Sequence, residues 1–166
     1  MTVTIRPADA GVPGDIEAIR TIHNQGIADR IATLDTTLRA PDETRAWLDG
    51  RGPRQPVVVA ELDGRVVGWA SLNRFNARAA YDHVADFSVY VERDWRGKGI
   101  GRQLLDRLID IARHIGFHKM VLAAMASNAA GIALYSRVGF RQVGVYHEQG
   151  QLDGRWVDVV IMEKLL

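Results

Sequence analysis

The chain has 166 residues, no cysteine and a formal net charge of +1. This length suits a single domain spanning residues 1–166, and the lack of cysteine excludes disulfides, thiolate metal sites and a cysteine nucleophile. The charge is balanced and no basic run is interleaved with aromatics, which disfavours nucleic-acid binding, and no apolar run reaches the ~18 residues of a membrane span. We therefore expect a cytoplasmic protein that binds no metal, nucleic acid or membrane.

The N-terminal third predicts one strand and two helices. Residues 2–6 alternate as in a strand and stop at Pro7, after which Asp15 is placed to cap a helix with a regular apolar face. Residues 30–41 lack a sustained period, so we expect an irregular segment that could form a substrate lid. A short helix is then predicted from Pro41 to Leu48.

The rest of the chain alternates between strand and helix patterns. A hairpin with the turn signal Asp63-Gly64-Arg65 comes first, and a second hairpin with a turn region at 150–154 closes the chain. This order predicts a mixed α/β sheet in a single domain. The predicted strands are 57–62, 66–72, 84–91, 119–125, 141–148 and 156–164, and the helices are 100–115 and 128–138.

The most informative segment is a glycine-rich loop between the strand 84–91 and the helix that begins at Ile100. Backbone amides next to glycine approach an anion without interference from Cβ, and a helix N-terminus adds unpaired N–H groups. A P-loop is excluded because Glu92 and Gly99 stand where glycine and Ser or Thr are required, and a dinucleotide fingerprint is excluded by Arg102. The loop residues predicted to hold a phosphate are Arg96, Gly97, Lys98, Gly99, Ile100, Gly101 and Arg102.

An Arg-x-x-Gly-x-Gly loop after a Val-Tyr-Val strand resembles the coenzyme-A pyrophosphate loop of the GNAT acyltransferase superfamily. Asn128, followed by Tyr135 and Gly139-Phe140, is similar to the second cofactor segment of that superfamily. The resemblance implies a mostly antiparallel central sheet flanked by helices, with acetyl-CoA as co-substrate. It also implies that Asn128 contacts the pantetheine arm, and that backbone N–H groups near Val89, Tyr90 and Val91 hold the arm and polarise the thioester.

Within that superfamily the chain is similar to the phosphinothricin and methionine-sulfoximine N-acetyltransferase branch, in the segments 77–82, 88–91 and 154–159. This resemblance implies transfer of acetyl to the primary amine of a small amino-acid-like substrate by direct attack in a ternary complex. Val157 stands where phosphinothricin-specific relatives carry histidine, which argues against phosphinothricin as the preferred substrate. The branch is commonly dimeric, so a homodimer is expected, in which the apolar residues Trp156, Val157, Val159 and Ile161 pair at a sheet edge or form another subunit contact.

Two residues are predicted to carry the chemistry. Asp86 stands where the branch usually has glutamate, so we expect it to accept the amine proton, through water because its side chain is shorter. The alternative is an aspartate that only bonds to nearby backbone. Tyr135 is the candidate to protonate the departing thiolate, and the alternative is a tyrosine that only packs on the sheet.

Substrate recognition is predicted in two loops. Arg78 and Tyr81, with Arg74 as a second candidate, could clamp a substrate carboxylate because a guanidinium binds one bidentately. Thr33 and Asp35 could recognise the amine or side chain. Two other functions stay open: a non-catalytic module that senses acyl-CoA, and a protein N-terminal acetyltransferase.

Overall fold

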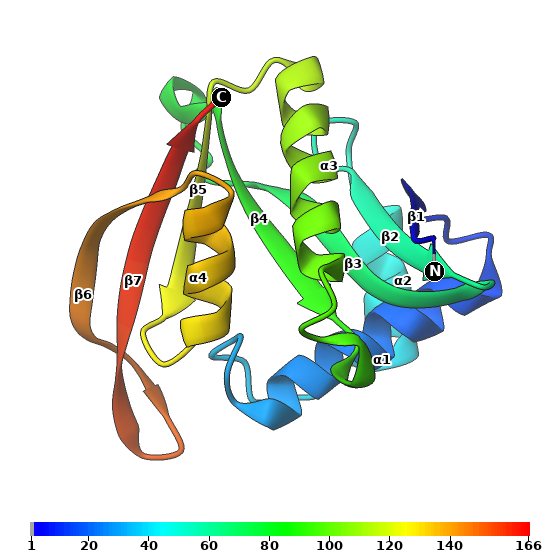
Figure 1. Ribbon diagram of the computed structural model, residues 1–166, viewed down its shortest axis with the longest axis horizontal. Helices are drawn as coiled ribbons and strands as arrows, with labels where there is room; N and C mark the ends of the chain where they lie inside the picture. The colour runs from blue at the N-terminus through cyan, green and yellow to red at the C-terminus, as the bar shows by residue number, and fades with distance from the viewer. Residues whose placement is uncertain (1) are drawn as a thin grey trace.

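The computed structural model describes residues 2–166 as one seven-stranded sheet with helices on both faces (Figure 1). The strand order is β1-β2-β3-β4-β5-β7-β6, and every neighbouring pair is antiparallel except β4 and β5. This confirms the predicted α/β fold with a mostly antiparallel sheet. The strands are β1 (Thr4–Pro7), β2 (Val57–Leu62), β3 (Arg65–Arg74), β4 (Val84–Val91), β5 (Lys119–Met125), β6 (Arg141–Leu152) and β7 (Arg155–Leu165).

Four helices and two short 3-10 turns connect the strands. The helices are α1 (Pro13–Asp29), α2 (Pro41–Asp49), α3 (Ile100–Ile115) and α4 (Ala129–Arg137), and the turns are η1 (Ala79–Tyr81) and η2 (Arg93–Trp95). Helix α3 buries Leu104, Leu105 and Leu108 against the sheet in the larger core cluster. Helix α1 buries Ile19 and Ile22 in a second cluster, which includes Val57, Val59 and Trp69. The two clusters occupy opposite faces of the sheet, as the periodic helical patterns require.

The helix start near Asp15 differs from the prediction. Helix α1 begins at Pro13, and Asp15 is a buried residue whose carboxylate accepts hydrogen bonds from Nη1 and Nη2 of Arg6, each at 2.8 Å. Its carboxylate also accepts the Asp9 backbone N–H at 2.9 Å. Proline already suits a first helical position, so Asp15 instead joins the helix to β1.

The two hairpins close by short turns. Asp63 and Gly64 have φ of 49° and 78°, which is the conformation of a two-residue hairpin turn. Asp153 and Gly154 repeat it at 50° and 76°, so the last turn is shorter than the predicted region 150–154 and β6 continues to Leu152. An irregularity between Tyr146 and Gly150 absorbs the additional residues of β6.

The predicted dimer strand also has a different place. Strand β7 lies between β5 and β6, so its backbone is paired on both sides and β6 is the edge strand. Val159 is buried, whereas Trp156 on β7 and Val143 and Tyr146 on β6 are exposed. The edge-pairing prediction for β7 was therefore wrong, because β6 precedes β7 in the chain and β7 returns between β5 and β6.

Candidate active site

The sheet opens between its two parallel strands. Strand β4 pairs with β5 only through Val84 with Lys119 and Ala85 with Met120, and the strands separate beyond these residues (Figure 1). From Asp86 onward, β4 is paired to β3 on one side only. Backbone groups on its other side are therefore available to a ligand that enters between the strands.

The glycine-rich loop leads from β4 into α3. Gly97 and Gly99 have φ of 74° and 81°, a left-handed conformation that favours glycine, and Gly99 is the residue that precedes the first turn of α3. The first N–H groups of α3 lack helical partners and carry the positive end of the helix dipole. The loop therefore leaves backbone N–H groups open to an anion, and its role in holding a phosphate stays a prediction.

Gly101 is required for a different reason. A Cβ at this position would lie 3.3 Å from Leu134 Cδ2 of α4 and 3.6 Å from a Val91 methyl. Its backbone is helical, and its small size allows the first turn of α3 to pack against β4 and α4.

The basic side chains of the loop differ in their partners. Arg96 donates to Asp29 Oδ2 at 2.6 Å and to the Val91 carbonyl at 3.1 Å, which anchors it to the end of α1. Lys98 lies over the Trp95 ring at 4.5 Å, and Arg102 is 3.4 Å from Asp106 on the exposed side of α3. Only Arg96 is thus fixed by several contacts.

Asp86 is half-buried on β4, just beyond the last residue pair with β5. Its Oδ1 accepts the Phe87 backbone N–H at 2.6 Å. Burial raises the pKa of this carboxyl from 3.8 to about 6, and the hydrogen bond from Phe87 opposes part of the rise. The carboxylate is therefore mostly ionised at neutral pH and is basic enough to accept a proton.

Tyr135 lies on α4 with its ring edge-on to Phe87 and Phe140, at centroid distances of 5.7 and 6.3 Å. Burial, together with the nearby Tyr90 and Asp86, raises its pKa to about 12. The phenol is thus protonated at neutral pH and can act as a hydrogen donor.

Asn128 is the residue before the first turn of α4. Its Oδ1 accepts the Gly131 backbone N–H at 3.0 Å, a capping interaction that stabilises the helix start. The side-chain amide nitrogen is not used in this cap. Asn128 therefore has an explained structural role, and the contact with pantetheine stays a prediction.

A cavity of about 370 Å³, hereafter the β3–β4 cavity, lies on the sheet face that α1 and α2 cover. One wall is aromatic: Trp69 stacks on Tyr90 at 5.0 Å and meets Trp47 edge-on at 5.4 Å. Gly26 lets α1 approach this wall, because a Cβ there would lie 2.9 Å from the Tyr90 ring. The lining residues are Ile19, His23, Thr33, Asp35, Arg39, Glu43, Thr44, Trp47, Trp69, Asn73, Ser88 and Tyr90.

The cavity brings together only some of the predicted substrate residues. Thr33 and Asp35 line it, whereas Arg74, Arg78 and Tyr81 do not. Arg74 donates to the carbonyls of Asn76 and Ala77 at 3.1 and 2.9 Å, so it stabilises its own loop. The Arg78 side chain is exposed and, within residues 2–166, has no hydrogen-bonded partner.

The alternation of side chains along β4 places Asp86 on the same sheet face as the β3–β4 cavity. Side chains on alternate positions of a strand share one face, so Asp86, Ser88 and Tyr90 point the same way. Their partners on β3 are Asn73, Ser71 and Trp69. Asn73 and Ser88 were not predicted as site residues, although the two-residue spacing from Asp86 to Ser88 and Tyr90 was a usable signal.

His23 also lines the cavity, with its ring 5.0 Å from that of Tyr90. Burial lowers its pKa, so the imidazole is neutral at pH 7. Thr33 and Asp35 bring the segment after α1 over the same cavity, with Asp35 3.2 Å from Arg39. The position of this segment agrees with the predicted lid.

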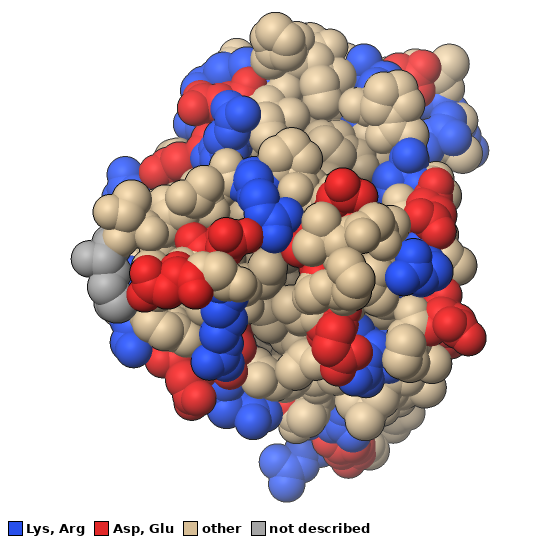
Figure 2. Space-filling model, turned by 90° about the vertical axis from the view of Figure 1, so that its right-hand side faces the viewer, with Lys and Arg blue, Asp and Glu red and all other residues tan. Residues whose placement is uncertain are grey.

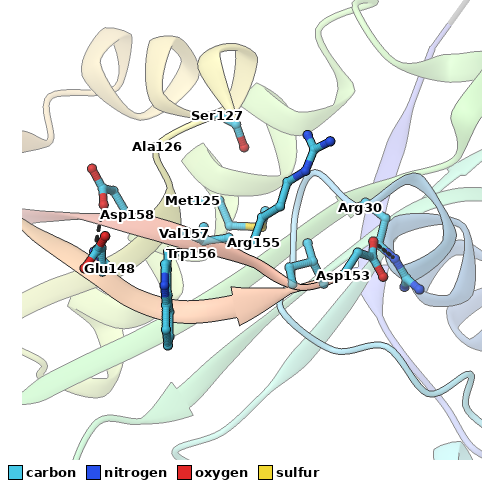
Figure 3. Close-up of a pocket in the computed structure, with 11 residues that line it drawn as sticks. Arg30, Met125, Ala126, Ser127, Glu148, Asp153, Arg155, Trp156, Val157 and Asp158 are labelled. Carbon is cyan, nitrogen blue, oxygen red and sulfur yellow. Dashed lines mark hydrogen bonds and ion pairs between the residues drawn. The ribbon is translucent and has the colours of Figure 1, made fainter.

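A larger, more open hollow of about 810 Å³ lies beside the β6–β7 turn and contains none of the predicted site residues (Figure 3). Arg30 at the end of α1 donates to Asp153 at 3.1 Å and joins that turn to the rest of the protein. Arg155 and Trp156 point to opposite sides of β7, and Trp156 is 64% exposed. This hollow is a surface feature separate from the Asp86 and Tyr135 region.

Charge on the surface is mixed. On the face seen in Figure 2, basic and acidic side chains are interspersed and neither sign forms one continuous patch. Across residues 2–166, no group of three His, Asp or Glu side chains is arranged to hold a metal ion, and no helix is long and apolar enough to cross a membrane.

A model of the acetyltransferase (GNAT) family matches residues 20–140, a region that includes β4, the glycine-rich loop and α4. The chain belongs to the GNAT acetyltransferase family. The resemblance seen in the loop is thereby confirmed, and the protein is an acetyl-CoA-dependent acyltransferase rather than only a sensor of acyl-CoA.

Relatives cover almost the whole chain. An L-methionine sulfoximine/L-methionine sulfone acetyltransferase of Pseudomonas paraeruginosa is 38% identical, over 98% of this chain and 94% of the relative. A phosphinothricin N-acetyltransferase of Streptomyces coelicolor is 31% identical, over 99% and 96%.

Solved structures agree with this fold. The Salmonella typhimurium protein yncA, solved with its cofactor acetyl-CoA, superposes with a TM-score of 0.94 at 35% identity, covering 100% of this chain and 95% of that one. A ribosomal-protein-alanine N-acetyltransferase from Brucella melitensis superposes with a TM-score of 0.93 at 38% identity, covering 98% and 99%.

Proposed function

We propose that this GNAT enzyme transfers acetyl from acetyl-CoA to the primary amine of a small amino-acid-like substrate, of the methionine sulfoximine, methionine sulfone or phosphinothricin type. The observation that carries the proposal is the position of Asp86. It lies where β4 leaves β5, on the same sheet face as the β3–β4 cavity. Relatives named for these substrates are similar over almost the full length of the chain.

The residues divide the work between two ends of the site. The N–H groups at Gly97, Gly99 and the start of α3 suit a pyrophosphate, and Arg96 adds charge from a fixed position. Acetyl-CoA supplies an activated acyl group whose thioester carbon the amine attacks directly. Free N–H groups of β4 beyond Asp86 support the proposed polarisation of the thioester oxygen.

Two proton transfers complete the reaction. Asp86, through water, accepts the proton that the amine loses as the new N–C bond forms. The C–S bond breaks, and Tyr135, whose pKa is about 12, gives its proton to the departing sulfur. Protonated Asp86 then releases its proton to solvent and the Tyr135 phenolate takes one up from solvent, so the enzyme returns to its starting state, with one proton lost by the amine and one gained by the CoA thiol.

A substrate panel tests the proposal. Free-thiol release should be fastest with L-methionine sulfone or sulfoximine, slower with phosphinothricin, and undetectable with peptides. The similarity to a ribosomal-protein-alanine N-acetyltransferase supports a second candidate, acetylation of a protein N-terminus. Faster turnover of peptides that begin with alanine would establish that second candidate and contradict ours.

Arg78 is proposed to bind the substrate carboxylate, since its guanidinium is exposed next to η1 and is free of partners within residues 2–166. Arg78→Ala should weaken transition-state binding of amino acids by about 1.5–3 kcal/mol, the usual worth of a charge-assisted hydrogen bond. The matched amine without a carboxylate should be turned over equally by both enzymes. Equal loss on both substrates would remove Arg78 from this role.

We further propose a cytoplasmic homodimer that forms through the outer surface of β6 and β7. Val143 and Tyr146 on the edge strand β6 are 53% and 55% exposed, and Trp156 on β7, on the sheet face opposite to Tyr146, is 64% exposed, an unusual amount of large apolar surface for two neighbouring strands. Trp156→Ser should shift sedimentation from dimer to monomer. A wild-type monomer at micromolar concentration contradicts the proposal.

A further inference from the structure

A chain of hydrogen bonds runs from Arg51 to the floor of the β3–β4 cavity. Arg51 Nη2 donates to Asn73 Oδ1 at 2.8 Å, and Asn73 Nδ2 donates to Ser88 Oγ at 3.0 Å. Arg51 itself is held by the carbonyls of Gln55 and Leu72. Asn73 and Ser88 both line the cavity, whereas Arg51 lies behind them.

The donor and acceptor groups of these side chains fix the direction of the hydrogen bonds. A guanidinium has donors only, so the Asn73 atom that faces Arg51 must be the amide oxygen. Ser71 donates to the same oxygen at 3.0 Å. The Asn73 nitrogen must therefore face Ser88, and Ser88 Oγ must accept. The hydroxyl hydrogen of Ser88 then points away from Asn73.

That hydrogen has no acceptor within residues 2–166, although Ser88 is half-buried at the cavity wall. Polar hydrogens in such places are normally paired with a ligand, water or protein oxygen. Arg51 also favours an acceptor oxygen next to Ser88, because Arg51 is half-buried and its hydrogen bonds all go to neutral oxygens. Its charge makes the potential at Ser88 more favourable to an oxygen with negative partial charge.

The register of β3 and β4 shows which part of a substrate meets Ser88. Along β4, the order is Asp86, then Ser88, then Tyr90, with the Arg78 loop before Asp86. In the proposed function, the carboxylate lies near Arg78 and the amine near Asp86. The substrate side chain then extends into the cavity past Ser88 to the aromatic wall.

We infer that the Ser88 hydroxyl donates a hydrogen bond to an acceptor oxygen in the side chain of the amine substrate, and thereby selects for such substrates. The inference rests on the proposed function for the placement of the amine. The substrate class is an amino acid with an oxygen acceptor, such as a sulfone, in mid-chain and an apolar end that packs on Trp69 and Tyr90.

L-Methionine sulfone and L-methionine form a matched pair of probes, because they differ only in the two sulfone oxygens. Isothermal titration of the full chain in the presence of CoA should show about tenfold tighter binding of the sulfone, the scale of one hydrogen bond. Ser88→Ala should remove most of that preference. Ser71→Ala is the matched control and should keep it, because Arg51 still donates to the Asn73 oxygen in this variant and so still fixes the direction of the Ser88 hydroxyl.

Asn73→Asp provides a second test at nearly constant shape. A carboxylate at this position has acceptors only, so the Ser88 hydroxyl must turn its hydrogen toward it and away from the cavity. The preference for the sulfone should again disappear. The inference is overturned if the preference for the sulfone survives in either Ser88→Ala or Asn73→Asp, or if the wild type shows no such preference. Acetyl transfer to the sulfone is measured separately: sulfone-selective binding without transfer would contradict the proposed function and leave the inference supported.

Discussion

Asp86→Asn should lower the catalytic rate while it raises the stability of the fold. The amide keeps an oxygen that can accept the Phe87 N–H, which in the wild type is 2.6 Å from Asp86. The variant loses only the ability to take a proton, so kcat/KM at neutral pH should fall by about 10²–10⁴-fold, the usual worth of a general base. Acetyl-CoA affinity should change little, because Asp86 is not in the glycine-rich loop.

The pH profile supplies a second observable. With a pKa of about 6, the carboxyl is about nine-tenths ionised at pH 7, so wild-type kcat/KM should rise with pH and level off above that pKa. Asp86→Asn should lose this inflection and regain part of its rate at higher pH, where more of the amine is already neutral. An Asp86→Asn enzyme with the wild-type rate and profile would refute the assignment.

The free energy of unfolding should fall with rising pH, in the opposite direction to kcat/KM. The fold raises the Asp86 pKa from 3.8 to about 6, so between these values the native state binds more protons than the unfolded state. The free energy of unfolding therefore falls as pH rises through this window, by up to about 3 kcal/mol. Asp86→Asn avoids this cost and should melt at a higher temperature at pH 7. Asp82, an exposed residue before β4, provides the control. Asp82→Asn should change neither the pH dependence of the free energy of unfolding nor the melting temperature at pH 7.

Three further predictions concern the cofactor loop, the acid and the fold. Gly99→Val places a branched side chain at φ 81°, so it should raise KM for acetyl-CoA severalfold and reduce thermal stabilisation by CoA; unchanged values would reject the loop assignment. Tyr135→Phe keeps the ring packing but should lower kcat about tenfold or more with little change in KM, as single-turnover kinetics would show, whereas an unchanged kcat would leave Tyr135 only a packing role. Asp15→Ala removes the buried carboxylate that accepts from Arg6 and from the Asp9 N–H and should cost about 1–3 kcal/mol in urea unfolding, while an unchanged unfolding midpoint would contradict that account.

Local signals in the sequence determined most elements of this protein. Apolar spacing predicted α3 and its core residues because a helix repeats every 3.6 residues whatever it packs against. Asp63-Gly64 predicted a hairpin because these residues tolerate positive φ. The glycine-rich loop was recognisable for the same reason, since Gly97 and Gly99 meet a local backbone requirement. Such features depend on neighbours in the chain, so they can be read from it.

Contacts between distant segments were decided only by the tertiary structure. Asp15 had the sequence position of a helix cap, but Arg6 offered it a buried bidentate partner. Gly101 appeared to serve ligand approach, but it is small because Leu134 of α4 packs on it. The separation of β4 from β5 after two residue pairs, and the Arg51 contact that orients Asn73 and hence Ser88, have no local pattern. Strand register and packing set these features, because each depends on residues that meet only after the sheet has formed.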